Sequence, residues 1–254
     1  MEPSRYRIFD SHMHIIDPHF PLIPNQGYLP NYFTCEDYHA RTAAFEVIGG
    51  AIVSGSFQGI DQTYLLESLK RLGPGFVGVT QFPATTPDEQ ILELNAAGVR
   101  AIRFNLRRGG PEALDQLEEM ARRVFDLAGW HTELYVDARD LPELESCVLA
   151  LPKVSIDHLG LSKEGFKTLL RLIEGGVYVK ATGFGRVDFD VSEALHAIYA
   201  RNPAALLFGT DLPSPRAPRP FLDTDVALVV ETLGEQRGNQ VLYENALSFY
   251  GVTA

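Results

Sequence analysis

Residues 7–15 read RIFDSHMHI, an apolar run that carries two histidines near its end. More apolar, β-rich runs follow it along the chain, which makes eight in all. The others are VIGGAIVSG (47–55), GFVGVTQF (75–82), VRAIRFNL (99–106), WHTELYVD (130–137), KVSIDH (153–158), VYVKATG (177–183) and ALLFGTD (205–211). Runs of this length and composition predict strands.

Amphipathic segments lie between most of these runs. In residues 61–72, for example, leucines 65, 66, 69 and 72 recur at the spacing of one helical face. The other predicted helices are 87–97, 112–128, 141–149, 163–174, 192–200, 221–234 and 236–250. Strands that alternate with helices pair in parallel through right-handed crossovers, so these units predict an α/β fold, a closed (β/α)8 TIM barrel in a single domain over residues 1–254. The alternative is an open doubly wound sheet, but no glycine-rich phosphate-binding fingerprint follows the first run.

The segment after the first run has a composition of its own. Residues 18–34 are rich in proline and aromatic residues. We expect a long loop here, and loops of this length without structure of their own are often functional.

Composition excludes several classes of partner. The chain is 45% hydrophobic and 22% charged, which is ordinary for a globular protein, and its net charge of −11 disfavours binding to nucleic acid or to an anionic membrane. It has no apolar run of about eighteen residues, and MEPSRYRIFD lacks the apolar core of a signal peptide, so we expect a cytoplasmic protein. Cys35 and Cys147 fit neither a disulfide framework nor a zinc site.

The residues best suited to chemistry stand at the ends of predicted strands, where barrel active sites lie. His12 and His14 are two apart, so their side chains point to the same side of the first strand. His158 ends the sixth run and Asp211 ends the eighth. Because strands eight and one are neighbours in a closed barrel, we expect Asp211 to approach both strand-one histidines. Such a set can hold a divalent metal, polarise a carbonyl group or take a proton from water.

Each of these residues also has a structural interpretation. His12 and His14 can be hydrogen-bonded core histidines, and Asp211 can cap the turn that follows its strand. His158 by itself fits a structural role as well as a functional one. The pair of histidines at one strand end favours the functional interpretation.

Arginines gather on the same predicted face of this acidic chain. They are Arg103, Arg107, Arg108, Arg186, Arg216 and Arg219. Guanidinium groups bind carboxylates and phosphates through paired hydrogen bonds, so the cluster predicts a small anionic substrate. Arg103 and Arg186 are the strongest candidates, although any one loop arginine is equally well explained by solvation.

Three other polar residues fall in or after strands. Ser56 offers a hydroxyl group and Tyr135 a phenol near the predicted site, and either can also be structural. Lys180 lies inside a strand, where we expect a paired, structural lysine rather than a reactive amine.

These motifs together resemble the amidohydrolase superfamily, in particular the 2-pyrone-4,6-dicarboxylate lactonase group of its amidohydrolase-2 branch. FDSHMHI (9–15) resembles the opening strand of these enzymes, and GTDLPSP (209–215) resembles the ending that carries their catalytic aspartate. The other similar stretches are SGSFQGID (54–61), GVRAIRFNL (98–106), GWHTELYVDARDLPEL (129–144), IDHLG (156–160), VKATGFGR (179–186) and YENALSFYG (243–251). The resemblance implies substrate contacts by Ser56, Arg103, Tyr135 and Arg186.

The chain also departs from its relatives. Where binuclear members of the superfamily carry metal ligands on strands four and five, this sequence has Arg103 and Tyr135. The resemblance therefore implies at most one divalent ion, zinc or manganese, or none. Its ligands would come from His12, His14, His158 and Asp211. The lactonase group works without a metal and the decarboxylases of the branch use one, so both schemes remain open.

The resulting prediction is a hydrolase that opens a carboxylated lactone or a related cyclic ester. Asp211 activates water, and the three strand-end histidines polarise the carbonyl group directly or through one metal ion. Arg103 and Arg186 hold the substrate's carboxylates, with Arg107 or Arg108 assisting. Ser54-Gly55 replaces the group's usual glutamine-proline, which leaves the exact substrate open.

Two other functions remain as alternatives. One is a metal-dependent decarboxylase of an aromatic or unsaturated acid, and the other is a non-catalytic barrel that binds an organic acid. Whether the chain forms a homo-oligomer is open as well.

Overall fold

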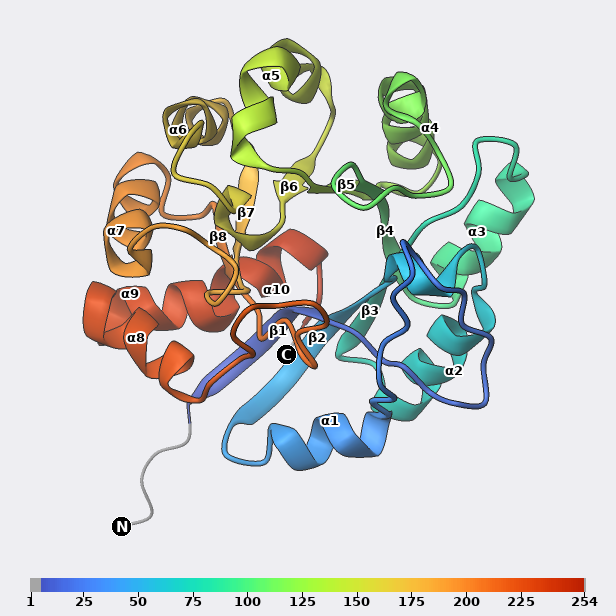
Figure 1. Ribbon diagram of the computed structural model, residues 1–254, viewed down its shortest axis with the longest axis horizontal. Helices are drawn as coiled ribbons and strands as arrows, with labels where there is room; N and C mark the ends of the chain where they lie inside the picture. Colours follow the sequence, from blue (N-terminus) through green and yellow to red (C-terminus); the bar gives the residue numbers. More distant parts are fainter. Residues whose placement is uncertain (1–5, 254) are drawn as a thin grey trace.

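The computed structural model describes residues 6–253, and its strands form one parallel sheet in the order β1 to β8 (Figure 1). The strands are β1 (Arg7–Met13), β2 (Glu46–Val53), β3 (Phe76–Thr80), β4 (Val99–Asn105), β5 (His131–Tyr135), β6 (Val154–Ile156), β7 (Tyr178–Ala181) and β8 (Leu206–Phe208). Each strand pairs in parallel with the next one in sequence. The predicted (β/α)8 TIM barrel is confirmed.

The barrel closes where β8 meets β1. The hydroxyl group of Ser11 donates to the carbonyl oxygens of Leu207 at 3.2 Å and Phe208 at 2.5 Å. Just beyond β8, the amide of Asp211 donates to the carbonyl oxygen of His12 at 2.7 Å, and the amide of His14 donates to that of Leu212 at 2.7 Å. These bonds hold the first and last strands together.

Helices surround the strands on the outside of the barrel (Figure 1). They are α1 (Cys35–Arg41), α2 (Thr63–Leu72), α3 (Asp88–Ala96), α4 (Leu117–Ala128), α5 (Leu141–Ala150), α6 (Phe166–Glu174), α7 (Val191–Arg201), α8 (Thr224–Leu233), α9 (Glu235–Asn239) and α10 (Asn245–Tyr250). On α2, Leu65 and Leu69 of the predicted stripe are buried, and the other two leucines pack partly buried against the same core. Within residues 6–253, every helix is too short or too polar to cross a bilayer.

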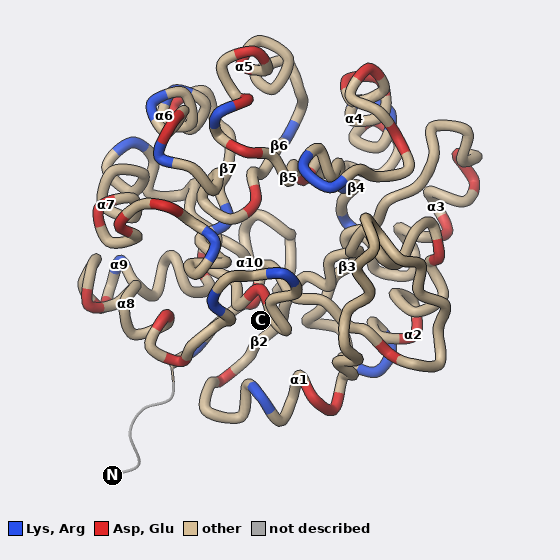
Figure 2. The backbone as a smooth tube through the Cα atoms, viewed as in Figure 1, with Lys and Arg blue, Asp and Glu red and all other residues tan. Residues whose placement is uncertain are grey.

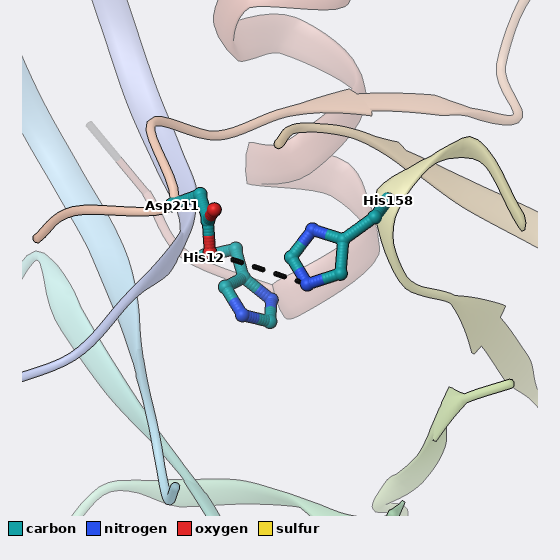
Figure 3. Close-up of side chains that lie close together, drawn as sticks. All are labelled: His12, His158 and Asp211. Carbon is teal, nitrogen blue, oxygen red and sulfur yellow. Dashed lines mark ion pairs between the residues drawn. The ribbon is translucent and has the colours of Figure 1, made fainter. Parts of the chain in front are cut away.

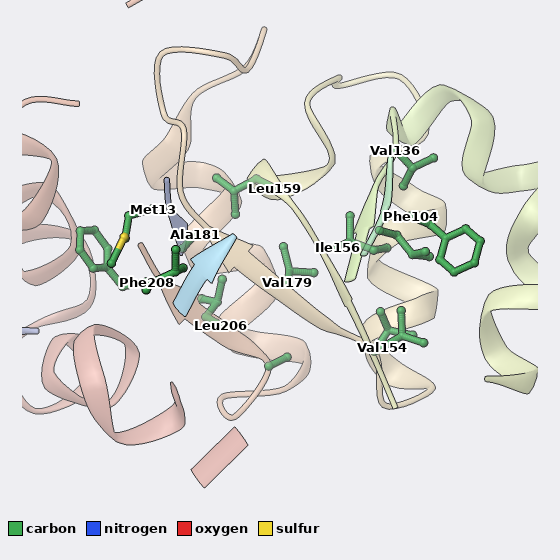
Figure 4. Close-up of a cluster of buried hydrophobic side chains, with 14 of the residues drawn as sticks. Met13, Phe104, Val136, Val154, Ile156, Leu159, Val179, Ala181, Leu206 and Phe208 are labelled. Carbon is green, nitrogen blue, oxygen red and sulfur yellow. The ribbon is translucent and has the colours of Figure 1, made fainter. Parts of the chain in front are cut away.

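The strands direct apolar side chains outward against the helices, and β4 to β7 place several polar or charged side chains inside the barrel. Side chains such as those of Val154, Ile156 and Val179 belong to the hydrophobic core between strands and helices (Figure 4). Their neighbours in sequence therefore point into the barrel. Lys180 is fully buried and its ammonium group lies 2.5 Å from Glu133 Oε2, so the predicted paired, structural lysine is confirmed.

Several predicted boundaries differ from the observed ones. The sixth and eighth runs were expected to remain strands through His158 and Asp211, but β6 ends at Ile156 and β8 ends at Phe208. Both residues have a positive φ, 53° for His158 and 63° for Asp211, which takes them out of the β region. The apolar pattern continues past the strand ends because these turns are also buried.

Helical segments differ too. The sequence prediction missed α1, although Thr34 and Asp37 form a capping box at its start. The predicted helix 236–250 is interrupted by a π-helical turn, Gln240–Glu244, between α9 and α10. Residues 18–34 contain no helix or strand, as predicted, but isolated bridges pair Ile16 with Phe33 and Asn25 with Tyr28.

Candidate active site

Three of the predicted site residues meet at the carboxyl-terminal mouth of the barrel (Figure 3). His12 comes from β1, His158 follows β6 and Asp211 follows β8. One ligand atom from each lies within 4.8 Å of the others, and Nε2 of His158 is 4.0 Å from Oδ1 of Asp211. All three side chains are buried.

Unusual backbone geometry aims two of these side chains. Left-handed φ values at residues other than glycine cost roughly 1–3 kcal/mol each and cluster at functional sites, and both His158 and Asp211 adopt them. Gly183, in the turn after β7, leaves room for the His158 side chain. A Cβ atom at Gly183 would lie 2.6 Å from Nδ1 of His158. The turns after β6, β7 and β8 are therefore built around the site.

His14 lies beside this group without joining it. Its Nδ1 is 2.7 Å from the carbonyl oxygen of Val53, and its ring centroid is 5.1 Å from that of His12. Because a carbonyl oxygen only accepts hydrogen bonds, Nδ1 carries the proton and Nε2 of the neutral ring carries a lone pair. Burial, followed by the nearby charges of His12 and Arg103, holds the pKa of His14 well below its usual range.

The other two histidines are neutral for similar reasons. Burial lowers the pKa of His12, and the charges of Lys180 and Arg103 oppose the favourable effect of Asp157. Burial also holds the pKa of His158 well below its usual value, and His12 and Arg186 lower it further. The site therefore presents neutral imidazoles near pH 7.

Asp211 keeps one oxygen atom without a partner. Its Oδ2 accepts a hydrogen bond from Nε of Arg186 at 2.6 Å, and Arg186 also donates to the carbonyl oxygen of Pro215 at 2.9 Å. Oδ1 of Asp211 is buried and accepts no hydrogen bond within the described residues, and Nε2 of His12 is in the same situation. Buried polar atoms of this kind are satisfied by water, an ion or a ligand.

A layer of paired charges supports the site from inside the barrel. Asp157 Oδ2 accepts hydrogen bonds from Arg103 Nε at 3.2 Å and Nη2 at 2.8 Å, and its Oδ1 is 3.4 Å from Nδ1 of His12. Burial alone would raise the pKa of Asp157, but His12, Arg103 and Lys180 hold it well below its usual range. Below it, Glu133 binds Lys180 and also accepts a hydrogen bond from the Tyr250 hydroxyl at 2.9 Å. We call Arg103, Glu133, Asp157 and Lys180 the ionic layer.

The sequence identifies the two cations of this layer, Arg103 and Lys180, but not the two carboxylates that pair with them. No motif marks Glu133, and Asp157 differs from a turn residue only in directly preceding His158. The available signal was their position, because a charged residue at an inward-facing site of a barrel strand requires a partner.

A pocket opens above the site. It encloses about 410 Å³, part of it open to solvent. Its wall consists of His14, Tyr28, Gly55, Ser56, Phe57, Arg103, Asn105, Arg108, Tyr135, His158, Arg186, Pro215 and Arg216. This wall contains four arginines and no acidic residue, and Figure 2 shows basic positions on the loops that border the centre of the barrel.

The other predicted residues differ in whether they line this pocket. Ser56, Tyr135 and Arg108 line it, and the Tyr135 ring lies 5.2 Å from the ring of His158. Arg107 does not line this pocket, and its guanidinium group instead binds Asp137 at 2.9 Å. Tyr28, from the loop of residues 18–34, is a further lining residue that the sequence did not single out.

The donor set at the mouth fits a single divalent ion. Zinc and manganese accept two imidazole nitrogens and a carboxylate oxygen as ligands. Nε2 of His12 and Oδ1 of Asp211 have no hydrogen-bond partner within the described residues, so both are available to bind such an ion. A second group, His12, Glu133 and Asp157, surrounds the ammonium of Lys180, which already supplies a positive charge there.

The sequence is similar to amidohydrolases and to proteins that are named for reactions of lactones. A family model described as amidohydrolase matches residues 9–252. The 2-pyrone-4,6-dicarboxylate hydrolase of Comamonas testosteroni is 29% identical over 234 residues, which are 81% of this chain and 76% of that protein. The D-galactarolactone isomerase of Agrobacterium fabrum is 26% identical over 265 residues, with 93% of this chain and 88% of that protein covered.

A solved structure shares the fold. The probable 2-pyrone-4,6-dicarboxylic acid hydrolase of Acinetobacter baumannii, crystallised with citric acid, superposes with a TM-score of 0.83 at 21% identity. The match covers 96% of this chain and 99% of that one.

Proposed function

The chain belongs to the amidohydrolase family, and we propose that it hydrolyses a carboxylated lactone or a related cyclic ester with Asp211 as the base. One observation carries the proposal. A buried carboxylate oxygen of Asp211, without a hydrogen-bond partner among residues 6–253, lies beside neutral imidazoles and next to His158 and Arg186, which line a pocket whose only charged wall residues are arginines. That arrangement suits a proton acceptor beneath an anionic substrate.

The relatives support the substrate class. The Comamonas protein is named for hydrolysis of a pyrone dicarboxylate, and the Agrobacterium fabrum protein is named for isomerisation of a sugar-acid lactone. Both named substrates are cyclic esters, and the first carries two carboxylates. A lactone is therefore the shared chemistry, and hydrolysis and isomerisation differ in whether a water molecule is consumed.

In the proposed reaction, Oδ1 of Asp211 removes a proton from water, and the resulting hydroxide attacks the lactone carbonyl carbon. Arg186, bound to Oδ2, fixes the carboxylate so that Oδ1 faces the site. His12 and His158 lie beside the position of the developing oxyanion, and the lone pair on Nε2 of His14 is available to accept a hydrogen bond from the substrate or to bind a metal ion. The ring C–O bond then breaks, and the leaving oxygen takes the proton from Asp211. The products are a carboxylic acid, which becomes a carboxylate by releasing its proton to solvent, and a hydroxyl or enol group.

The pocket wall supplies the substrate contacts in this proposal. Arg103 uses three N–H groups on Asp157 and Ser54, and Arg186 uses two on Asp211 and Pro215. A guanidinium group has five N–H groups, so both retain donors for a substrate. Ser56, Tyr135 and Arg108 complete the contacts. A zinc or manganese ion held by His12, His158 and Asp211, with His14 beside them, would polarise the carbonyl group and acidify the attacking water.

The Asp211→Asn variant tests the proposal. A positioned base contributes roughly 10²–10⁴-fold, so we expect turnover of carboxylated lactones to fall by that factor, while substrate binding measured by calorimetry persists. Asp225→Asn is the matched control, because Asp225 is also buried and bound to an arginine, Arg219, but lies outside the pocket.

The product identifies the reaction class. Mass spectrometry should show the gain of one water molecule by the substrate. An unchanged mass would identify an isomerase and release of CO₂ would identify a decarboxylase. Near-normal turnover by Asp211→Asn would reject Asp211 as the base.

A further inference from the structure

Asp10 lies where the barrel closes, two residues before His12 on β1, and the proposed reaction gives it no role. Its carboxylate is fully buried and accepts hydrogen bonds on both oxygen atoms. Oδ1 accepts from the backbone amides of Thr210 at 2.8 Å and of His12 at 3.3 Å. Oδ2 accepts from the hydroxyl groups of Thr210 at 2.6 Å and of Tyr38 at 3.1 Å.

These four hydrogen bonds leave Asp10 no capacity to bind a ligand. A carboxylate group has about four lone-pair positions, and the chain itself uses all of them. Asp10 is therefore not a ligand of a metal ion or of a substrate, although it is close in sequence to His12. Two of the four donors belong to Thr210, which directly precedes the proposed base Asp211. The carboxylate is thus committed to the residue before the base.

Thr210 connects Asp10 to the turn that contains Asp211. Its hydroxyl group donates to Asp10 and also accepts a hydrogen bond from the backbone amide of Leu212 at 3.1 Å. Between them, the amide of Asp211 donates to the carbonyl oxygen of His12 at 2.7 Å. One hydroxyl group therefore joins the two neighbours of Asp211, and its orientation depends on Asp10.

The turn needs this support because Asp211 has a φ of 63°. A left-handed conformation is unfavourable for a residue other than glycine, and it persists only where the surrounding structure imposes it. Gly209 lets the backbone before the turn come close to β1. A Cβ atom at Gly209 would lie 2.7 Å from the amide nitrogen of His12 and 3.3 Å from Oδ1 of Asp10.

We propose that Asp10 and Thr210 are positioning residues, whose hydrogen bonds hold the turn after β8 in the conformation that directs Oδ1 of Asp211 towards the attacking water. The inference rests on the proposed function, because that function makes Asp211 the base. Arg186 fixes the other oxygen of the same carboxylate, so Asp211 is held at its side chain and at its backbone. Tyr38 completes the hydrogen bonds of Asp10 and links α1 to the site.

Thr210→Val and Thr210→Ser form a matched pair of variants. Valine has the shape of threonine without the hydroxyl group, so the hydroxyl bonds to Asp10 and Leu212 are lost, whereas serine keeps them. A displacement of about 1 Å costs on the order of 10²-fold in rate, so we expect kcat for carboxylated lactones to fall about 10–100-fold in Thr210→Val. KM should stay within about 3-fold of wild type, and Thr210→Ser should restore kcat to within about 3-fold.

Tyr38→Phe is a milder variant of the same network. It removes one donor from Asp10 and keeps both bonds of the Thr210 hydroxyl group. We therefore expect kcat to fall about 3–10-fold, which is less than in Thr210→Val. Wild-type kcat in both variants would overturn the inference and leave the proposed reaction intact.

Thr168→Val is the control variant. Thr168 is also buried, and its hydroxyl group accepts a hydrogen bond from Arg171 at 3.0 Å, but it lies on α6 and does not line the pocket. Its kcat and KM should match those of the wild type. A loss of kcat as large as in Thr210→Val would show that any lost buried hydroxyl has this effect, and would overturn the inference.

Hydrogen exchange followed by NMR tests the turn without any substrate. In Thr210→Val, the amides of Asp211 and Leu212 should exchange faster, by about 10-fold more than the amides of β4 and β5. A uniform increase would report only lower global stability and, like unchanged rates in the turn, would overturn the inference. If the turn amides respond and no lactone is hydrolysed, the proposed function fails while the hold of Asp10 and Thr210 on the turn is supported.

Discussion

The ionic layer is buried, whereas Arg108 and Arg216 of the pocket wall are partly exposed, and the two regions balance positive charge differently. In the ionic layer, Lys180 of β7 meets Glu133 of β5, and Arg103 of β4 meets Asp157, which follows β6, so each cation has a carboxylate from two strands away. In the pocket wall, Arg108 and Arg216 have only neutral neighbours within the described residues. Arg103 and Arg186 of the same wall are paired with carboxylates, so the contrast with the ionic layer applies to Arg108 and Arg216 alone.

The largest effect on stability is expected when a cation is removed from the ionic layer. Lys180→Met leaves the buried carboxylates of Glu133 and Asp157 without their ammonium partner. Removing one member of a buried ion pair costs about 3–5 kcal/mol, so the free energy of unfolding measured in urea should fall by that amount. Lys163→Met, at an exposed position, should change it by less than about 0.5 kcal/mol. A loss for Lys180→Met no larger than for this control would contradict the pairing.

Lowering the pH should gradually weaken the ion pair between Glu133 and Lys180. Burial raises the pKa of Glu133, but Lys180 and His131 outweigh it and lower the pKa from 4.5 to about 2. Because the pKa is lower in the folded state, this stabilisation is present above about pH 4.5 and is lost as the pH falls towards 2. The free energies of unfolding of the wild type and of Glu133→Gln should therefore differ at pH 7. As the pH falls towards 2, this difference should shrink by on the order of 3 kcal/mol. Parallel curves in urea titrations across this range would count against the prediction.

The smallest effect is expected at the pocket wall. Without ligand, Arg216→Gln should change the free energy of unfolding by no more than about 1 kcal/mol, because no ion pair is broken. Excess glutarate, a dicarboxylate that suits the arginines of the wall, should then raise the Tm of the wild type and leave that of the variant nearly unchanged, since only a bound ligand stabilises the folded state. Scanning calorimetry with and without glutarate measures both quantities. A large loss of stability in the unliganded variant would place Arg216 with the ionic layer instead.

The barrel could be predicted from the sequence because its signal is local. Each strand is a short apolar run, and the outward residues of β6 and β7 occupy the helix-facing positions that the pattern implies. The ends of β6 and β8 could not be placed, because apolar periodicity does not report the positive φ of His158 and Asp211.

The site was harder to predict for a different reason. Chemistry-bearing residues at strand ends could be named, but their partners depend on the register of distant strands. Glu133 and Lys180 are 47 residues apart, and their contact follows from how β5, β6 and β7 align. Arg107 and Arg108 are adjacent in sequence, yet one binds Asp137 and the other lines the pocket, which only the shape of their turn decides.

The meeting of β1 and β8 also has a consequence for biosynthesis. His12 and Asp211 come from opposite ends of the chain, and the amide of Asp211 reaches the carbonyl of His12 only when the last strand docks on the first. In a nascent chain whose β8 is still inside the ribosome, Asp211 cannot yet reach His12 and His158, so the cluster lacks the proposed base. Under the proposed mechanism, we therefore expect hydrolytic activity only after β8 has docked on β1 and closed the barrel.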